Sequence, residues 1–79
     1  MSLFEKANSA TSKTDFIEFI EMLRKDLANN PETWENLSID MYLFAIERWV
    51  EDYQAPDIDF EDPDWRTISA MFYMGKIYE

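Results

Sequence analysis

The sequence predicts an all-α fold: a small antiparallel three-helix bundle with an extra short helical turn around Trp34. Three segments repeat apolar residues at steps of three and four, which is the spacing of one helix face. Proline, asparagine and acidic residues separate these segments, and no segment shows the two-residue alternation of a half-buried strand. We expect residues 1–13 to be an N-terminal tail and residues 14–79 to form a single helical domain.

The first predicted helix runs from about Asp15 to Asn29. Thr14 or Asp15 can cap its start, and Asp15 with Glu18 has the D-x-x-E spacing of a capping box. The helix should end before Pro31, because the residue that precedes a proline avoids helical backbone angles. Its apolar stripe consists of Phe16, Phe19, Ile20, Leu23 and Leu27.

The extra turn and the second helix follow. Pro31 suits the first position of a short turn, and we expect Trp34 to fold back over the first helix. The second helix is predicted from about Ile39 to Tyr53, with Ser38 as its cap. Apolar side chains occupy more than one side of this helix. It should therefore be the centre of the bundle, or else be shared with a second chain.

The last third of the chain contains a linker and the third helix. Residues 54–62 should be extended. Ile58 and Phe60 alternate with acidic residues there, and we expect these two side chains to pack against the core. The third helix is predicted to start at Pro63, with Asp62 as its cap. Gly75, the only glycine, falls on the inward face of this helix and indicates a close helix crossing or a C-terminal kink.

Charge narrows the range of partners. Seventeen acidic and seven basic residues give a net charge of −10. DNA, RNA and anionic membranes are poor partners for such a chain, because binding a phosphate backbone needs clustered Lys and Arg. A basic protein is an electrostatically favourable partner, and the same charge also confers solubility. There is no cysteine and no membrane-length apolar run, so we expect a cytosolic protein.

Residue types also narrow the chemistry. The chain has no histidine and no cysteine, so the usual proton shuttle, the best nucleophile and the preferred zinc ligands are all missing. One glycine cannot build a glycine-rich phosphate loop. A glycosidase-like pair of carboxylates would need a deeper cleft than a chain this small offers. We therefore expect neither an enzyme nor a cofactor.

The densest polar feature is the acidic run Asp57, Asp59, Glu61, Asp62 and Asp64. It is not an EF-hand, because the glycine and the final bidentate glutamate of that loop are missing. Asp62 and Asp64 are explained by the start of the third helix. Asp57, Asp59 and Glu61 have no such structural role and are the candidate partner-binding residues. A weak divalent-cation site and a purely solvated segment are the alternatives.

Trp34, Trp49 and Trp65 are spread along the chain, one for each helical segment after the first helix. Large aromatic residues of this kind usually anchor a core, and we predict that role for all three. The same residue type is also frequent in binding hot spots.

Several short motifs resemble a family of small bacterial domains of unknown function. These motifs are D-F-I-E-F at 15–19, N-P-x-x-W-E-N at 30–36 and W-V-E-D at 49–52, with a later Trp65 and a closing Tyr78-Glu79. The resemblance covers about residues 14–79, implies a bacterial cytosolic protein and supplies no catalytic residue. Small acidic proteins of this general kind include immunity proteins that neutralise toxins, which is an analogy of class only.

Three hypotheses follow for the function. The first is a non-catalytic protein-binding module, of which an immunity or antitoxin role against a basic toxin is one form. The second is a structural homodimer, or a subunit of an assembly, joined through the broad apolar face of the helix at 39–53. The third is a weak cation-binding module at 57–64.

Overall fold

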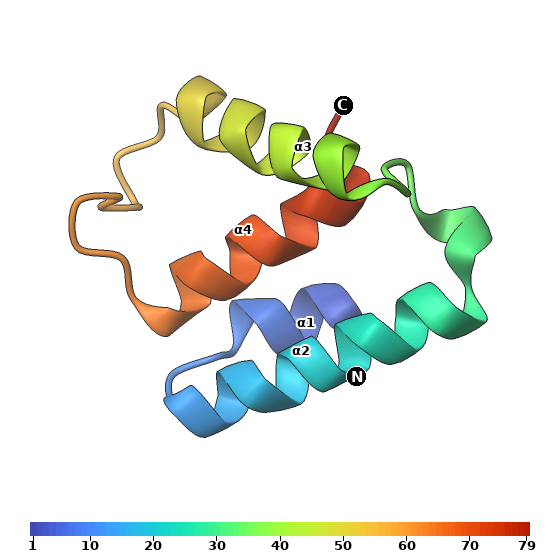
Figure 1. Ribbon diagram of the computed structural model, residues 1–79. Coiled ribbons are helices and arrows are strands. Elements are labelled where there is room, and N and C mark those ends of the chain that lie inside the picture. Colours follow the sequence, from blue (N-terminus) through green and yellow to red (C-terminus); the bar gives the residue numbers. More distant parts are fainter.

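The computed structural model describes all 79 residues and contains helices and connections but no strand (Figure 1). The prediction of an all-α bundle is confirmed, and so are the three predicted helices. The elements are α1 (Leu3–Asn8), α2 (Lys13–Asn29), the 3-10 turn η1 (Pro31–Thr33), α3 (Ile39–Asp52) and α4 (Trp65–Ile77). The turn η1 is the predicted extra turn, and Trp34 follows it directly.

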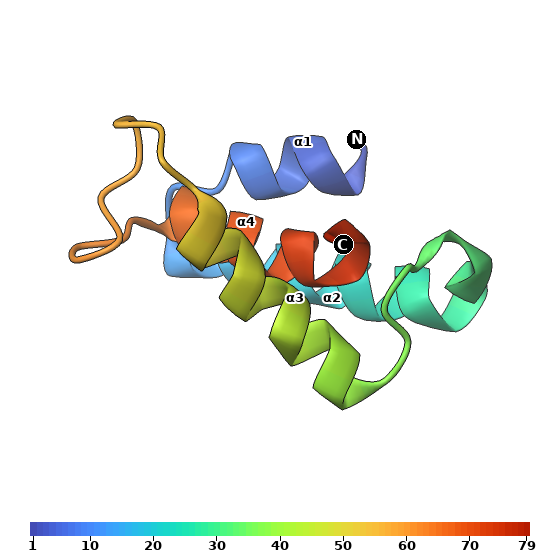
Figure 2. The ribbon, with the colours of Figure 1, turned by 90° about the horizontal axis from the view of Figure 1, so that it is seen from above.

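The centre of the bundle is α4 and not α3. Among the helices, α3 packs against α4 alone, whereas α4 also contacts α1 and α2. Seen from above, α1 and α3 lie on opposite sides of α4 (Figure 2). The expectation that the helix at 39–53 would be central is therefore wrong. Apolar residues lie on several sides of α3, and those that α4 does not cover are exposed. They include Ile39, Met41, Leu43 and Phe44.

Residues 1–13 contain a helix where the sequence predicted only a tail. Ser2 and Glu5 form a capping box, in which each side chain accepts a hydrogen bond from the other residue's backbone N–H at 3.1 Å. Ala7 and Ala10 are buried where this segment meets α2 and α4. The S-x-x-E signal at Ser2 was present in the sequence, but six residues are too few to show a periodic stripe.

Two helices begin at other residues than predicted. Ser12, rather than Thr14 or Asp15, caps α2, and its hydroxyl accepts from the Asp15 N–H at 3.1 Å. Asp64, rather than Asp62, caps α4. Asp62 is already used in the preceding turn, where its N–H donates to the Asp59 carbonyl at 3.2 Å. The predicted cap of α3 is confirmed, because the Ser38 hydroxyl accepts from the Met41 N–H at 3.1 Å.

The core is small, since 12 of the 79 residues are buried. One cluster joins Ala7, Phe19, Leu23 and Trp34 from α1, α2 and the connection after η1. Near the C-terminal end of α3, the ring of the buried Trp49 packs edge to face against the rings of Tyr53 and Phe60. The predicted core role is thus confirmed for Trp34 and Trp49, and Phe60 is tucked in as expected. Trp65 is only half-buried.

Candidate functional site

The connection between η1 and α3 is fastened to the end of α4, and we call residues 34–36 the strap. The side-chain amide of Asn36 donates to the carbonyls of Gly75 and Tyr78, at 3.0 and 2.9 Å. The backbone N–H of Glu35 donates to the Lys76 carbonyl at 3.0 Å. The last carbonyls of a helix have no partner within the helix, so the strap supplies the donors that the end of α4 lacks.

A largely buried ion pair holds the other side of the strap. Lys76 Nζ lies 2.7 Å from Asp26 Oδ2, and Trp34 Nε1 donates to the same oxygen at 2.8 Å. Asn30 donates to the second oxygen at 3.2 Å. Burial alone would raise the pKa of Asp26, but the hydrogen bonds from Lys76, Trp34 and Asn30 outweigh it and hold this pKa below its usual value. Asp26 therefore orients Trp34 as a charged group.

Tyr42 links the start of α3 to α4. Its hydroxyl donates to the Phe72 carbonyl at 2.7 Å, and burial raises the pKa of Tyr42 to about 12. A Cβ at position 75 would lie 2.6 Å from an atom of the Tyr42 ring, so only glycine leaves room for this contact. The predicted close crossing at Gly75 is confirmed. The ring of Tyr42 also lies nearly parallel to that of Trp34, with 6.0 Å between their centroids.

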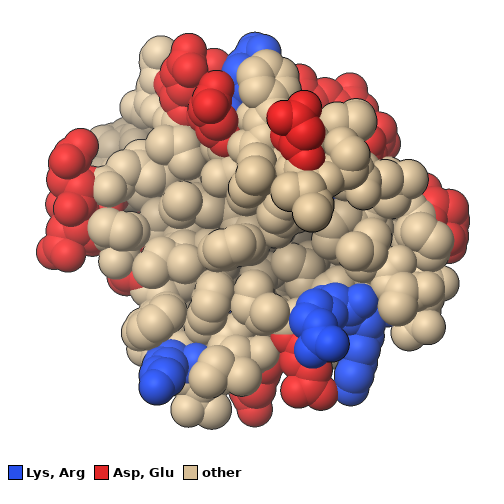
Figure 3. Space-filling model, viewed as in Figure 1, with Lys and Arg blue, Asp and Glu red and all other residues tan.

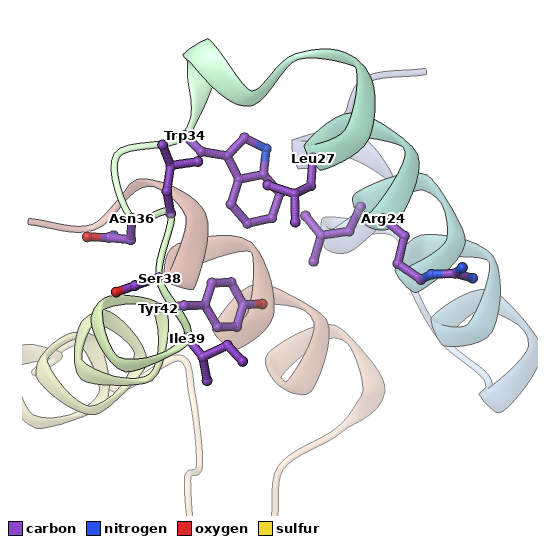
Figure 4. Close-up of a pocket in the computed structure, with 9 residues that line it drawn as sticks. Arg24, Leu27, Trp34, Asn36, Ser38, Ile39 and Tyr42 are labelled. Carbon is purple, nitrogen blue, oxygen red and sulfur yellow. The ribbon is translucent and has the colours of Figure 1, made fainter.

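Trp34 and Tyr42 line a hollow of about 210 Å³ between the end of α2, the strap and the first turn of α3 (Figure 4). Sites for drug-sized ligands are usually about 300–1,000 Å³, so this hollow suits one large side chain better. Arg24 is its only charged lining residue, and the guanidinium points away from the hollow in Figure 4. The apolar lining consists of Leu23, Leu27, Trp34, Leu37, Ile39 and Tyr42.

Large apolar side chains surround the hollow and are exposed. The exposed fractions are 41% for Leu27, 62% for Leu37, 79% for Ile39 and 57% for Leu43, which lies one turn after Ile39. We call these four residues and the hollow the α2–α3 face. Figure 3 shows a broad uncharged band across the molecule between α3 and α2, with charged atoms along its edges. Exposed apolar side chains that lie this close together are uncommon on protein surfaces, whereas single ones are ordinary.

The two edges of this band differ in charge. Asp40, Glu47 and Glu51 are exposed on the side of α3 that points away from α4. At the opposite edge, α2 carries Arg24, which has no carboxylate within 4.0 Å, and Lys25, which is paired with Glu21 at 2.9 Å. In Figure 3 mostly acidic atoms lie above the band, with one basic group among them, and both basic and acidic atoms lie below it. The face is therefore apolar in the middle, acidic along α3 and basic at Arg24.

The sequence matches a family of unknown function, DUF7660, over residues 12–79. The chain belongs to this family. No curated protein and no solved structure matched the chain. In this DUF7660 chain the match begins at the cap of α2 and contains the strap, the hollow and α4, whereas α1 lies before it. The predicted resemblance to a family of domains of unknown function is thereby confirmed.

The motif N-P-x-x-W-E-N has a structural role in the DUF7660 chain. Asn30 and Trp34 donate to Asp26, Pro31 begins η1, and Asn36 binds the end of α4. These residues shape the hollow, because they fix the position of the Trp34 ring. The motif is therefore a means of joining α2, the strap and α4.

The acidic residues singled out by the sequence lie elsewhere. Asp57 accepts from the Tyr53 hydroxyl at 2.8 Å, and Asp59 accepts from the Glu61 N–H at 3.0 Å. Their loop leaves α3 at the end opposite to Ile39 (Figure 1), so it is remote from the hollow. No group of three or more acidic side chains is arranged to hold a metal ion. No helix combines the length and the apolar character that crossing a membrane requires.

Sequence reasoning pointed only to the α3 part of the α2–α3 face, through the hypothesis of a homodimer joined by the broad apolar face of the helix at 39–53. Its one signal was the two-sided apolar pattern of the helix at 39–53, which was consistent with either a central helix or a shared one. Arg24 and Leu37 gave no signal of their own, because they join the face only through the path of the strap.

Proposed function

We propose that this chain is a non-catalytic protein-binding module that docks a partner protein on the α2–α3 face. The observation that carries the proposal is the exposure of Leu37, Ile39 and Leu43 around a hollow that is already formed. Burying such side chains stabilises a complex by about 25 cal/mol for each Å² of apolar surface removed from water. A partner that covers the face gains this energy without rearranging the bundle.

The hollow has the properties of an interface hot spot. Trp34 is held by Asp26 at 2.8 Å and Tyr42 by the Phe72 carbonyl at 2.7 Å, so both rings are fixed before a partner arrives. The binding energy of an interface concentrates in a few central pockets of this kind. Fixed walls also reduce the ordering entropy that binding costs. We therefore expect one large apolar side chain of the partner to enter the hollow.

Charge at the edges specifies the partner further. A surface that matches the face has an apolar patch, a basic side opposite Asp40 and Glu47, and an acidic group opposite Arg24. Complementary edges of this kind set orientation and raise the association rate more than they raise affinity. The basic part of a partner's surface thus docks along α3, at Asp40 and Glu47, and not at Asp57, Asp59 and Glu61.

The non-catalytic part of the proposal is supported by the groups whose pKa is shifted. Hydrogen bonds from Ser2 lower the pKa of Glu5, and hydrogen bonds from Thr11 lower that of Asp15. Hydrogen bonds from Thr67 lower the pKa of Asp64. All three carboxylates stabilise helix starts. A general acid needs a raised pKa, so none of these three carboxylates suits that role.

The test compares two substitutions of equally exposed residues. Leu43→Glu places a charge on the face, whereas Phe4→Glu changes a residue of α1 that is 58% exposed on the other side of α4. Each of the three proteins is immobilised and incubated with a lysate of the producing cells. A protein that the wild type and Phe4→Glu retain, and that Leu43→Glu does not, is purified. Its affinity for each of the three is then measured by calorimetry.

We expect Leu43→Glu to weaken the purified complex at least about tenfold, which corresponds to roughly 1.4 kcal/mol. Hydrogen exchange should slow at residues 37–44 when the partner binds. Equal affinity of the wild type and Leu43→Glu for the purified partner would refute the proposal. So would the failure of the wild type to retain any protein, a second copy included, at both low and high salt.

A further inference from the structure

We infer that the partner docked on the α2–α3 face is a second copy of this chain, an inference that rests on the proposed function. The face requires a partner with an apolar centre, an edge of one charge and an opposite edge of the other charge. The chain itself has such a surface, with Asp40, Glu47 and Glu51 on one edge and Arg24 on the other. A twofold dimer uses the same patch on both copies, so a self-complementary face is what it needs.

The charges select one of the two ways to pair the faces. A twofold axis that runs along the uncharged band turns α3 of one copy toward α2 of the other (Figure 3). This arrangement sets Arg24 of each copy against the acidic α3 edge of its partner. An axis that runs across the band would set the two acidic edges against each other, which is unfavourable. The first arrangement pairs the one unpaired cation of the face.

A dimer interface of ordinary size would cover a moderate share of the molecule. A standard interface buries about 800 Å² on each partner, close to one seventh of the 5453 Å² accessible surface of this chain. In this arrangement Ile39 and Leu43 of each copy would lie against the α2 side of the other, and each hollow would receive an apolar side chain of the other copy.

The dependence of the affinity on ionic strength distinguishes a second copy of this chain from a basic partner protein. Each copy carries a net charge of −10, so two copies repel each other at long range. Salt screens this repulsion, and raising NaCl from about 0.05 M to about 0.5 M should tighten the dimer. A basic partner of another kind would be attracted by the same charge, and its complex would weaken over the same range.

Sedimentation equilibrium of the full chain tests the inference. We expect a dimer with a dissociation constant in the micromolar range or below, as for other interfaces of standard size. Leu43→Glu should give a monomer and Phe4→Glu should not. Arg24→Glu should weaken the dimer about tenfold or more. Arg66→Glu, which makes the same change in net charge on α4, should have little effect. Unchanged melting temperatures show that the variants remain folded.

The possible results distinguish the inferred dimer from the proposed function. A wild type that stays monomeric at every salt concentration overturns the inference, as does a dimer that Leu43→Glu leaves intact. If the chain is a monomer but binds another protein in a manner that Leu43→Glu abolishes, the inference fails and the proposed function stands. If Leu43→Glu disrupts neither association, both fail. A dimer that is sensitive to Leu43→Glu but not to Arg24→Glu overturns the pairing of the edges.

Discussion

The ring of Tyr42 occupies the space that a side chain at Gly75 would need. The nearest ring atoms lie 2.6–2.9 Å from the position of a Cβ at residue 75, closer than real contacts allow. The ring cannot easily move away, because its hydroxyl is bound to the Phe72 carbonyl. This contact fixes the distance between α3 and α4, and it also holds one wall of the hollow in place.

Gly75→Ala should therefore destabilise the chain, although alanine is the better helix former by about 1 kcal/mol. Overpacking of a tight contact costs about 1–3 kcal/mol, so we expect a net loss of about 1 kcal/mol in the free energy of unfolding, measured with urea. In a Tyr42→Ala background the clash is absent. There Gly75→Ala should stabilise the chain, and a loss in both backgrounds would contradict the proposed clash.

Ser69→Ala should stabilise the chain. The Ser69 hydroxyl is fully buried in α4 and has no hydrogen-bond partner. Leaving such a group unpaired costs about 1–3 kcal/mol, and alanine removes it while keeping the packing. We expect a gain of about 1 kcal/mol and a higher melting temperature. Ser38→Ala is the matched control, because the same change removes the cap of α3 and should cost about 1 kcal/mol. A loss for Ser69→Ala would indicate a partner for its hydroxyl.

Asp26→Asn should destabilise the chain at neutral pH by about 2 kcal/mol, since it leaves Lys76 without its charged partner in a largely buried place. The pKa of Asp26 is lowered in the folded chain, so its contribution is present above the unfolded pKa of about 3.9 and is lost as the pH falls toward the folded value. The difference in unfolding free energy between wild type and variant should thus shrink below about pH 4. Urea titrations at a series of pH values measure it.

The control for Asp26 is Glu61→Gln, which changes an exposed carboxylate whose side chain makes no hydrogen bond or ion pair. Its effect on stability should be close to zero across the same range. If the effect of Asp26→Asn were equally large at neutral and acidic pH, the ion pair with Lys76 would not be its cause.

Asn36→Asp should loosen the strap. The change replaces a side-chain amide, which donates to two carbonyls of α4, with a carboxylate that repels them. We expect a loss of about 2 kcal/mol in the free energy of unfolding. Faster hydrogen exchange at the Glu35 N–H, which is bound to the Lys76 carbonyl, would locate the change. Native exchange at this amide would show that the strap does not depend on Asn36.

Much of the secondary structure could be predicted from local pattern. The stripe from Phe16 to Leu27 and the cap at Ser38 identified α2 and α3, because helical spacing and capping act within a few residues. Gly75 indicated a close crossing, because a glycine on an inward helix face lets a neighbouring element approach the backbone. The sequence did not predict α1, because a helix of 6 residues is too short to show a periodic apolar pattern.

The site could not be predicted in the same way. Asn36 binds residues 39 and 42 positions later in the chain, and Asp26 meets Lys76 across 50 positions. No local pattern encodes contacts of this range. The acidic run at Asp57 attracted attention because of its composition, whereas the exposed apolar face depended on which side of α3 is covered by α4. That choice is made by tertiary packing.

The strap has a consequence for the order of events during synthesis. The walls of the hollow come from residues 23–42, but the groups that hold them in place, Phe72, Gly75 and Lys76, are translated after them. A nascent chain that has not yet released α4 contains every residue of the face and still cannot assemble it. The association proposed for this face would therefore have to wait until α4 has left the ribosome, so that half-made copies could not join one another.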